Sequence, residues 1–384
     1  MMSSSFHIKR IAAIAFILLG VMFFAQCSKE PEVLNTTNDT NTDKPYTPTP
    51  YIMQMPLGWS MPPIPVDNPL TVEGVELGRK LFYDPILSRT NTISCASCHN
   101  PDFAFTDNGK QFSSGVDGIS GKRNSMPLFN LAWVERFAPT LNGRPVRFFW
   151  DGGASTLEAQ ALAPIIDPIE MNESLTNVIQ KLQNHPLYPG MFKKAFGSDS
   201  ITTKRLAQAI AQFERTIISS TTKHDRFLIN PVSGKRFDST VFSEQELRGL
   251  RVFSLEEKGD CFHCHNHSTP FTSDFQFHHN GHRSTDSGLY RITLNPADVG
   301  KFRTPSLRNL VYTAPYMHDG RFKTLEEVVE HYDNGVIRSH PTDPLYLKHP
   351  EGLQLSAQEK ADLVAFLKTM TDSTFFLKPQ YRKP

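Results

Sequence analysis

The pentapeptide CASCH at residues 95–99 recurs as CFHCH at residues 261–265. The pattern C-x-x-C-H is the attachment signature of c-type haem, in which two thiols form thioethers with the haem and the His binds the iron. These two motifs contain four of the five cysteines of the chain. A redox C-x-x-C pair, or half of a zinc site, would leave the following His unexplained in both motifs. The sequence therefore predicts two covalently bound haem c groups.

The chain has room for one haem in each of two halves. Its 384 residues fit two domains, and 39% of them are hydrophobic. The sequence WDG at 150–152, followed by TLE at 156–158, returns as HDG at 318–320, followed by TLE at 324–326. The two copies have nearly the spacing of the haem motifs, which indicates an internal duplication. The predicted haem-binding residues are Cys95, Cys98 and His99 in the first half, and Cys261, Cys264 and His265 in the second.

The pattern between the motifs is mainly helical. Capping-box spacing, S/T-x-x-E, starts at Ser155, Ser243, Thr324 and Ser356, each before a plausible helix. Long stretches punctuated by Pro and Gly, at 100–127 and 267–298, read as loops that wrap a haem. We predict a mostly α fold of two cytochrome c-like domains, each binding one covalently attached haem c.

The N-terminus reads as a targeting segment. Two basic residues at 9–10 precede an apolar run at 11–25, which suits a signal peptide within residues 1–27. The sequence FAQC at 24–27 resembles a bacterial lipoprotein box, although Gln26 departs from the usual small residue. Lipidation at Cys27, simple cleavage and an uncleaved anchor remain alternatives, and lipidation is favoured. All three place the chain in the periplasm or cell envelope.

Residues 28–60 are rich in Thr, Asn, Asp and Pro, and we expect a flexible tether there. The net charge of the whole chain is +1, without a strongly biased block, so nothing indicates a nucleic-acid partner.

From about Met61 to the C-terminus the chain resembles the bacterial di-haem cytochrome c peroxidase superfamily, which includes MauG. The resemblance is carried by TISCASCHNPDFAF, by FFWDGGASTLEAQALAPIIDPIEM and by FRTPSLRNLVYTAPYMHDGRFKTLEEVVEHY. It implies an N-terminal peroxidatic haem domain at 61–229 and a C-terminal electron-transfer haem domain at 230–384. Family members are often homodimers, so a homodimer is a further expectation.

The resemblance implies catalytic roles for three residues. Gln160 and Glu170 would lie in the distal pocket of the first haem, and Trp150 would carry electrons or holes between the haems. Cleavage of a peroxide O–O bond needs a group that takes a proton from one oxygen and returns it to the other, and a carboxyl group can do this. Burial beside a haem should raise the pKa of Glu170 towards neutrality. Without the resemblance, Glu170 would read as a solvated carboxylate and Trp150 as a core indole.

The resemblance also implies a calcium ion near the domain interface. Asn124 and the backbone carbonyls of Thr313 and Pro315 would hold it. These are oxygen donors, as a hard cation requires. Taken alone, Asn124 would be a turn residue.

Two departures from the family pattern concern the iron ligands. Many members carry a labile distal His in the loop after the first motif, but residues 100–184 contain no His, and Val116 stands at about that place. We therefore predict an open, five-coordinate N-terminal haem, with Met126 as a weaker alternative ligand.

At the second haem, the position that holds a Met in ordinary peroxidases is Tyr332. A phenolate stabilises the oxidised metal, whereas a thioether raises the reduction potential. Met317 is the competing ligand, and His278, His279 and His282 are further candidates. Tyr332 as a core residue on one helical face is the structural alternative.

These features favour a peroxidase that reduces hydrogen peroxide to water with electrons from a small cytochrome c or cupredoxin. The C-terminal haem would relay or store oxidising equivalents. One alternative is a MauG-like, peroxide-dependent oxidase of a protein or organic substrate. However, the surface Trp of MauG before its second motif is replaced here by Gly259. A non-catalytic di-haem electron-transfer protein is the alternative of another class, and it would have two six-coordinate haems.

Overall fold

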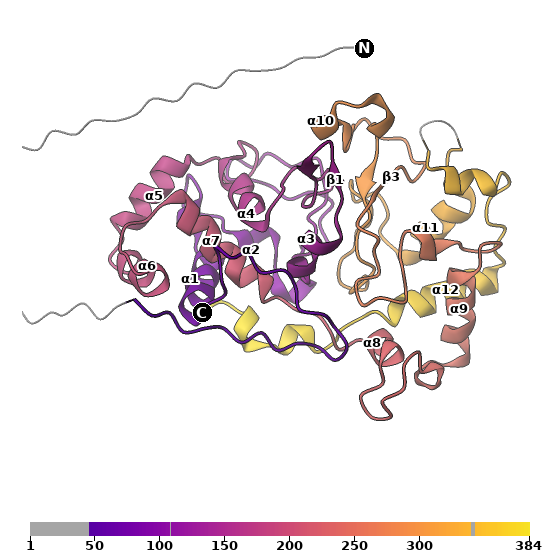
Figure 1. The fold of residues 1–384 in the computed structure, drawn as a ribbon. Coiled ribbons are helices and arrows are strands. Elements are labelled where there is room, and N and C mark those ends of the chain that lie inside the picture. The colour runs from indigo at the N-terminus through magenta and orange to yellow at the C-terminus, as the bar shows by residue number, and fades with distance from the viewer. Residues whose placement is uncertain (1–45, 108, 339–341) are drawn as a thin grey trace, which may run out of the picture. The chain divides into compact units, whose positions relative to one another are not determined.

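The computed structural model describes residues 46–107, 109–338 and 342–384 (Figure 1). The predicted signal peptide and Cys27 lie outside these ranges. Residues 46–384 form one compact unit. Among the described residues, no helix combines the length and the apolar character that crossing a bilayer would require.

Helices dominate the described residues, which confirms the mostly α fold class. The helices of the N-terminal half are α1 (Val72–Tyr83), α2 (Cys95–Cys98), α3 (Val134–Phe137), α4 (Leu157–Ile166), α5 (Leu175–Gln183), α6 (Tyr188–Phe196) and α7 (Thr203–Arg215). Those of the C-terminal half are α8 (Lys223–Leu228), α9 (Glu244–Ser254), α10 (Tyr290–Thr293), α11 (Leu325–Glu330) and α12 (Ala357–Lys368). Helix α8 precedes the expected boundary at 229/230, but its Phe227 and Leu228 pack in the hydrophobic cluster of the C-terminal half. Two antiparallel pairs of short strands are β1 (Thr140–Leu141) with β2 (Arg144–Pro145), and β3 (Phe277–His278) with β4 (Phe302–Arg303).

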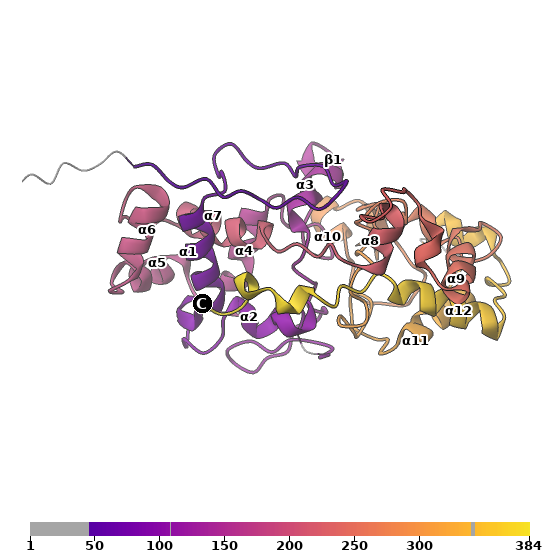
Figure 2. The same cartoon turned by 90° about the horizontal axis from the view of Figure 1, so that it is seen from below.

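Each half is built on a crossing of two helices, α1 on α7 and α9 on α12 (Figures 1 and 2). Both crossings depend on a glycine. A Cβ added at Gly78 of α1 would lie 1.8 Å from the carbonyl oxygen of Ala209 on α7. A Cβ added at Gly249 of α9 would lie 2.0 Å from the carbonyl oxygen of Asp362 on α12. The same packing device therefore occurs once in each half.

The backbone also repeats around the duplicated WDG and HDG sequences. An isolated antiparallel bridge joins residues 148 and 154 in the first half, and another joins residues 316 and 322 in the second. A threonine then caps the next helix, Thr156 for α4 and Thr324 for α11. The order of bridge, cap and helix is thus the same in both halves, as a duplication predicts.

The predicted capping boxes at Ser243, Thr324 and Ser356 are confirmed. The box predicted at Ser155 is wrong by one residue. Thr156 is the cap, and its Oγ1 accepts a hydrogen bond from the amide of Ala159. With Thr156 as the cap, Glu158 stands one position before the place of a capping-box Glu. Its carboxylate instead binds Arg215, with Nη1 and Oε1 2.7 Å apart.

The described part of the expected tether, residues 46–60, packs against the N-terminal half instead of forming a free linker. Met53 is buried in the core of the N-terminal half, and Trp59 packs edge-on against Trp133 with ring centroids 5.1 Å apart. The indole Nε1 of Trp133 donates to the carbonyl of Ser60 over 2.7 Å. The prediction fails here because scattered apolar side chains dock on a distant core, which local composition does not reveal.

The C-terminal residues return to the N-terminal half. Phe375 and Tyr381 belong to the hydrophobic cluster that contains Phe82 and Phe213. The Arg79 guanidinium donates through Nε to the carbonyl oxygen of Arg382 over 2.6 Å. In both views the C-terminus lies beside α1 (Figures 1 and 2).

We expect Gly78→Ala to destabilise the protein by about 1–3 kcal/mol, because the new methyl group would meet a backbone carbonyl that cannot swing aside. Gly190→Ala is the matched control. Gly190 lies in helix α6, where an added Cβ meets nothing within 4 Å, so we expect about 0.5–1 kcal/mol of stabilisation. Urea denaturation of both variants measures the difference. Equal midpoints would show that the α1–α7 crossing tolerates the methyl group.

Candidate functional site

The first haem motif borders a cavity, which we call the N-terminal cavity. Its empty volume is about 530 Å³, and Cys95, Cys98 and His99 lie on its wall. Helix α2 carries both thiols and starts at a capping box made by Ser94 and Ser97. His99 follows the helix directly, so the local fold sets the two thiols and the imidazole together.

The second motif borders a larger cavity, the C-terminal cavity, with an empty volume of about 1360 Å³. Cys261, Cys264 and His265 lie on its wall. Apolar residues of α11 and α12 surround the rest of it, including Val329 and Leu363. A mainly apolar cavity beside a C-x-x-C-H motif fits a large, flat cofactor.

The two motif histidines are held as iron ligands should be. The Nδ1 of His99 lies 2.9 Å from the carbonyl oxygen of Phe105, and the Nδ1 of His265 lies 3.2 Å from that of Thr272. A carbonyl only accepts hydrogen bonds, so Nδ1 carries the proton and Nε2 is left for a metal. Burial lowers the pKa of His99 and lowers that of His265 to about 4, which favours the neutral form of each ring. The residues present therefore fit two haem c groups.

The predicted distal residues border the N-terminal cavity. Gln160 lies on α4, is 7% exposed, and its Oε1 has no hydrogen-bond partner among the described residues. Glu170 follows α4 and borders the cavity, and it is exposed rather than buried as expected, because the cavity opens on it. The protein packed around its other sides disfavours the charged form, and the nearby Asp167 adds to this, so the pKa of Glu170 is raised to about 7. The cavity thus holds a carboxyl group that can both accept and donate a proton near neutral pH.

The loop that would carry a labile distal His packs against Glu170. The amide of Val116 donates to the carbonyl of Glu170 over 2.9 Å. A Cβ added at Gly115 would lie 2.1 Å from the carbonyl of Ile169, so the close packing requires glycine. Besides His99, no His lies among the described residues that border the N-terminal cavity. Met126 does not border it either, and its sulfur contacts Arg303 instead.

Trp150 belongs to the N-terminal half but borders the C-terminal cavity. Its indole Nε1 donates to the carbonyl of Asn124 over 2.9 Å, and its own carbonyl accepts from the amide of Arg303 over 2.8 Å. An ion pair between Arg123 and Asp286, 2.6 Å apart, lies next to this contact and also joins the two halves. The indole is therefore fixed at the junction.

The three predicted calcium ligands, Asn124, Thr313 and Pro315, all border the C-terminal cavity. The side-chain Nδ2 of Asn124 donates to the carbonyls of Lys110 and Gln111 over 3.1 and 3.2 Å. These bonds fix the amide group with its oxygen turned away from both carbonyls, as a cation ligand requires.

Both candidate ligands of the second haem, Tyr332 and Met317, border the C-terminal cavity. Tyr332 lies in η7 (His331–Gly335), a π-helical turn directly after α11, and such turns are frequent at functional sites. Burial raises the pKa of its phenol to about 12 in the absence of a metal. Met317 accepts a hydrogen bond on its sulfur from Asn280, with the two atoms 3.3 Å apart. The fold brings both residues to the same cavity.

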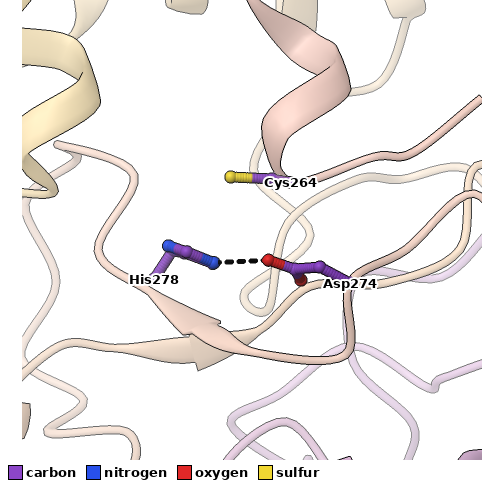
Figure 3. Close-up of side chains that lie close together, drawn as sticks. All are labelled: Cys264, Asp274 and His278. Carbon is purple, nitrogen blue, oxygen red and sulfur yellow. Dashed lines mark hydrogen bonds and ion pairs between the residues drawn. The ribbon is translucent and has the colours of Figure 1, made fainter. Parts of the chain in front are cut away.

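Of the three candidate ligands in the His-rich loop, His278 borders the C-terminal cavity. His278 is held between two carboxylates, Asp274 at 2.8 Å and Asp343 at 2.6 Å, so both ring nitrogens are engaged. Burial alone would lower the pKa of His278, but the hydrogen bonds to the two carboxylates, with a smaller contribution from the free Cys264 thiol, outweigh burial and raise the pKa. His279 and His282 do not border the C-terminal cavity. Cys264, Asp274 and His278 lie close together (Figure 3), but a thioether at Cys264 would remove its thiolate from any metal site there.

Two residues at the cavities were missed from the sequence. Tyr346 borders the C-terminal cavity and stacks on Tyr332, with ring centroids 5.9 Å apart and planes inclined by 17°. Glu214, near the end of α7, borders the N-terminal cavity. No local sequence pattern distinguishes either residue, because only the folded chain brings Tyr346 and Glu214 to the cavity walls.

Comparison with known proteins supports this arrangement. The family model described as di-haem cytochrome c peroxidase matches residues 72–232. The methylamine utilization protein MauG of Methylophilus methylotrophus is 37% identical over 312 residues, covering 80% of this chain and 85% of the relative. The chain belongs to the di-haem cytochrome c peroxidase family.

Some relatives in this family are named peroxidases and others are named MauG or MauG-like. The cytochrome c551 peroxidase of Nitrosomonas europaea is 33% identical over 327 residues, covering 84% of this chain and 86% of the relative. Among solved structures, a MauG-like protein associated with microbial copper homeostasis is 33% identical with a TM-score of 0.72, covering 87% of this chain and 99% of that one. The di-haem family has two cytochrome c-like domains and two haem c groups, in agreement with the two C-x-x-C-H motifs and the two cavities.

Proposed function

We propose that this chain is a di-haem c-type peroxidase that reduces hydrogen peroxide to water with electrons from a small redox protein, a cytochrome c or a cupredoxin. One observation carries the proposal. The N-terminal cavity combines a haem attachment motif with Gln160 and Glu170, and no second His lies among the described residues on its wall. A bound haem would supply the iron that takes up peroxide and exchanges electrons with it.

In this proposal Glu170 moves the proton that O–O cleavage requires. Its carboxylate accepts a proton from one peroxide oxygen and returns it to the oxygen that leaves as water. A pKa of about 7 lets the group do both near neutrality. The amide of Gln160, whose Oε1 is unpaired, orients peroxide by hydrogen bonding.

The junction between the halves would pass electrons between the two haems. Trp150 is fixed there by its hydrogen bonds to Asn124 and Arg303. Cys261, Cys264 and His265 would hold the second haem, which relays or stores oxidising equivalents, with Tyr332 as its further ligand and Met317 as the alternative. We also propose a calcium ion on Asn124, Thr313 and Pro315, and export to the periplasm or cell envelope with lipidation at Cys27.

A MauG-like oxidase of a protein or organic substrate is the second candidate, because MauG of Methylophilus methylotrophus is among the similar relatives. The structure offers little for long-range protein oxidation through tryptophan. A side chain at Gly259 would begin 2.6 Å from the carbonyl of Val252, so no indole fits there. Trp59 and Trp133 pack against each other in the core of the N-terminal half.

The resting ferric protein, with both haems bound, tests the proposal. We expect its electron paramagnetic resonance spectrum to show one high-spin and one low-spin haem. Steady-state assays should show peroxide consumption with reduced cytochrome c or cupredoxin. Two low-spin haems at rest would contradict the open N-terminal site and favour an electron carrier. Oxidation of a partner protein, with no turnover of small donors, would favour the oxidase.

A further inference from the structure

The N-terminal cavity contains a second carboxyl group that the proposed mechanism does not use. Glu214 lies in the last turn of α7 and borders the cavity together with Gln160 and Glu170. Its side chain is only 2% exposed, and its Oε2 has no hydrogen-bond partner among the described residues. A buried, unpaired carboxyl oxygen is costly and calls for a functional explanation.

The other buried polar residues of α7 are engaged in the structure. Gln208 donates to the carbonyl of Asp67 over 2.6 Å, and Gln212 donates to the side chain of Asn68 over 2.8 Å. Glu214 alone in this group lacks such a partner among the described residues. The burial of Glu214 is therefore not explained by the hydrogen bonds that join α7 to the rest of the fold.

The neighbouring arginine does not neutralise Glu214 by an ion pair. The guanidinium of Arg215 binds both carboxylate oxygens of Glu158, at 2.7 and 3.1 Å, and also contacts Glu135 at 3.4 Å. One turn earlier on α7, Ile210 and Ala211 are fully buried and apolar. Burial raises the pKa of Glu214 to about 8; Arg215 lowers it in part, and Glu158 adds to the rise. The other titratable residues that border the cavity are Cys95, Cys98, His99 and Glu170.

We propose that Glu214 is a proton donor of the peroxide cavity, distinct from Glu170. The inference rests on the proposed peroxidase function. Reduction of one peroxide breaks its O–O bond and consumes two electrons, from the donor protein, and two protons, giving two waters. Glu170 only moves a proton between the two peroxide oxygens, so both consumed protons enter from elsewhere. Glu214 supplies one of them from its carboxylic acid and regains it from solvent between turnovers.

The test compares Glu214→Gln with Glu76→Gln in the full chain with both haems bound. Glu76 lies on α1, is exposed, and borders neither cavity, so its variant controls for loss of a carboxyl group. We expect Glu214→Gln to lower kcat for peroxide by about 10- to 100-fold, with KM for peroxide unchanged, and to enlarge the solvent deuterium isotope effect on kcat. Glu214→Asp keeps the acid and should recover part of kcat.

Infrared spectroscopy gives a readout that does not depend on turnover. At pH 7 we expect a C=O band of a protonated carboxylic acid that is present in the wild type, in Glu76→Gln and in Glu170→Gln but absent in Glu214→Gln. The partly protonated Glu170 contributes a separate band, which only Glu170→Gln removes. Haem content and the thermal midpoint should match the wild type, because Gln replaces a neutral acid of the same shape. If kcat and the isotope effect are unchanged, or the band persists in Glu214→Gln, the inference is wrong. If the wild type itself consumes no peroxide, the proposed function fails instead, whatever the infrared result.

Discussion

Replacement of Glu170 by Gln is expected to lower kcat for peroxide reduction by about 10²–10⁴-fold. The amide keeps the shape and the hydrogen-bonding capacity of the side chain but cannot accept a proton. Peroxide binding needs no proton transfer in this scheme, so KM for peroxide should change little. Steady-state assays with a reduced donor protein measure both constants. Unchanged turnover would remove Glu170 from its assigned role.

The pH dependence of kcat/KM is a second test of the role of Glu170. Glu170 must start as a carboxylate, and its pKa is about 7. As the pH falls below this value the group becomes protonated, so kcat/KM should fall about tenfold per pH unit. Glu170→Gln should lack this acid limb.

Asp167→Asn provides a matched variant for the pH profile. Asp167 raises the pKa of Glu170 by its charge, and its Oδ1 accepts a hydrogen bond from the amide of Ile169. Asparagine keeps the accepting oxygen and removes the charge, so the acid limb should move to lower pH while the maximal rate stays high. If the acid limb of the kcat/KM profile does not shift in Asp167→Asn, a group other than Glu170 is responsible for it.

Tyr332→Met is expected to raise the reduction potential of the C-terminal haem by hundreds of millivolts. A phenolate stabilises ferric iron, a thioether stabilises ferrous iron, and axial ligands together span about 0.8 V. Spectroelectrochemistry of the two haems measures the shift. The N-terminal haem should keep its potential, since Tyr332 borders only the C-terminal cavity.

Met317→Leu is the control for this second prediction. Met317 borders the same cavity, but if Tyr332 is the ligand its removal should leave the spectrum and the potential of the C-terminal haem nearly unchanged. If instead Met317→Leu alters the spectrum and Tyr332→Phe leaves it unchanged, the iron ligand is the sulfur of Met317.

The features that could be predicted from the sequence are those determined by residues close together in the chain. A haem motif needs its three haem-binding residues within five positions, and a capping box needs two residues three apart, so both are visible locally. The cap of α4 shows the limit, because Glu158 is bound by Arg215 and Thr156 takes the place expected of Ser155.

The parts that could not be predicted depend on distant partners. Residues 46–60 look like a linker, yet Ser60 is held by Trp133, 73 residues away. Glu214 precedes an arginine on an amphipathic helix, a setting that is typical of a solvated carboxylate. Only the fold shows that the charge of Arg215 is already taken by Glu158. The candidate distal residues came from family resemblance, because one sequence cannot show that Gln160 and Glu170 share a cavity.

The C-terminal residues follow the second haem site in the sequence, but they pack against the residues that support the first haem site. Tyr83 donates its hydroxyl hydrogen to the carbonyl of Tyr381, and the ring of Phe375 packs edge-on against Phe105 and Phe129. Phe105 is also the residue whose carbonyl orients His99. Truncation of the last ten residues, none of which borders either cavity, would therefore loosen the support of the peroxide-binding haem. No single cut can release the N-terminal half as an intact module, because its core is completed by the end of the chain.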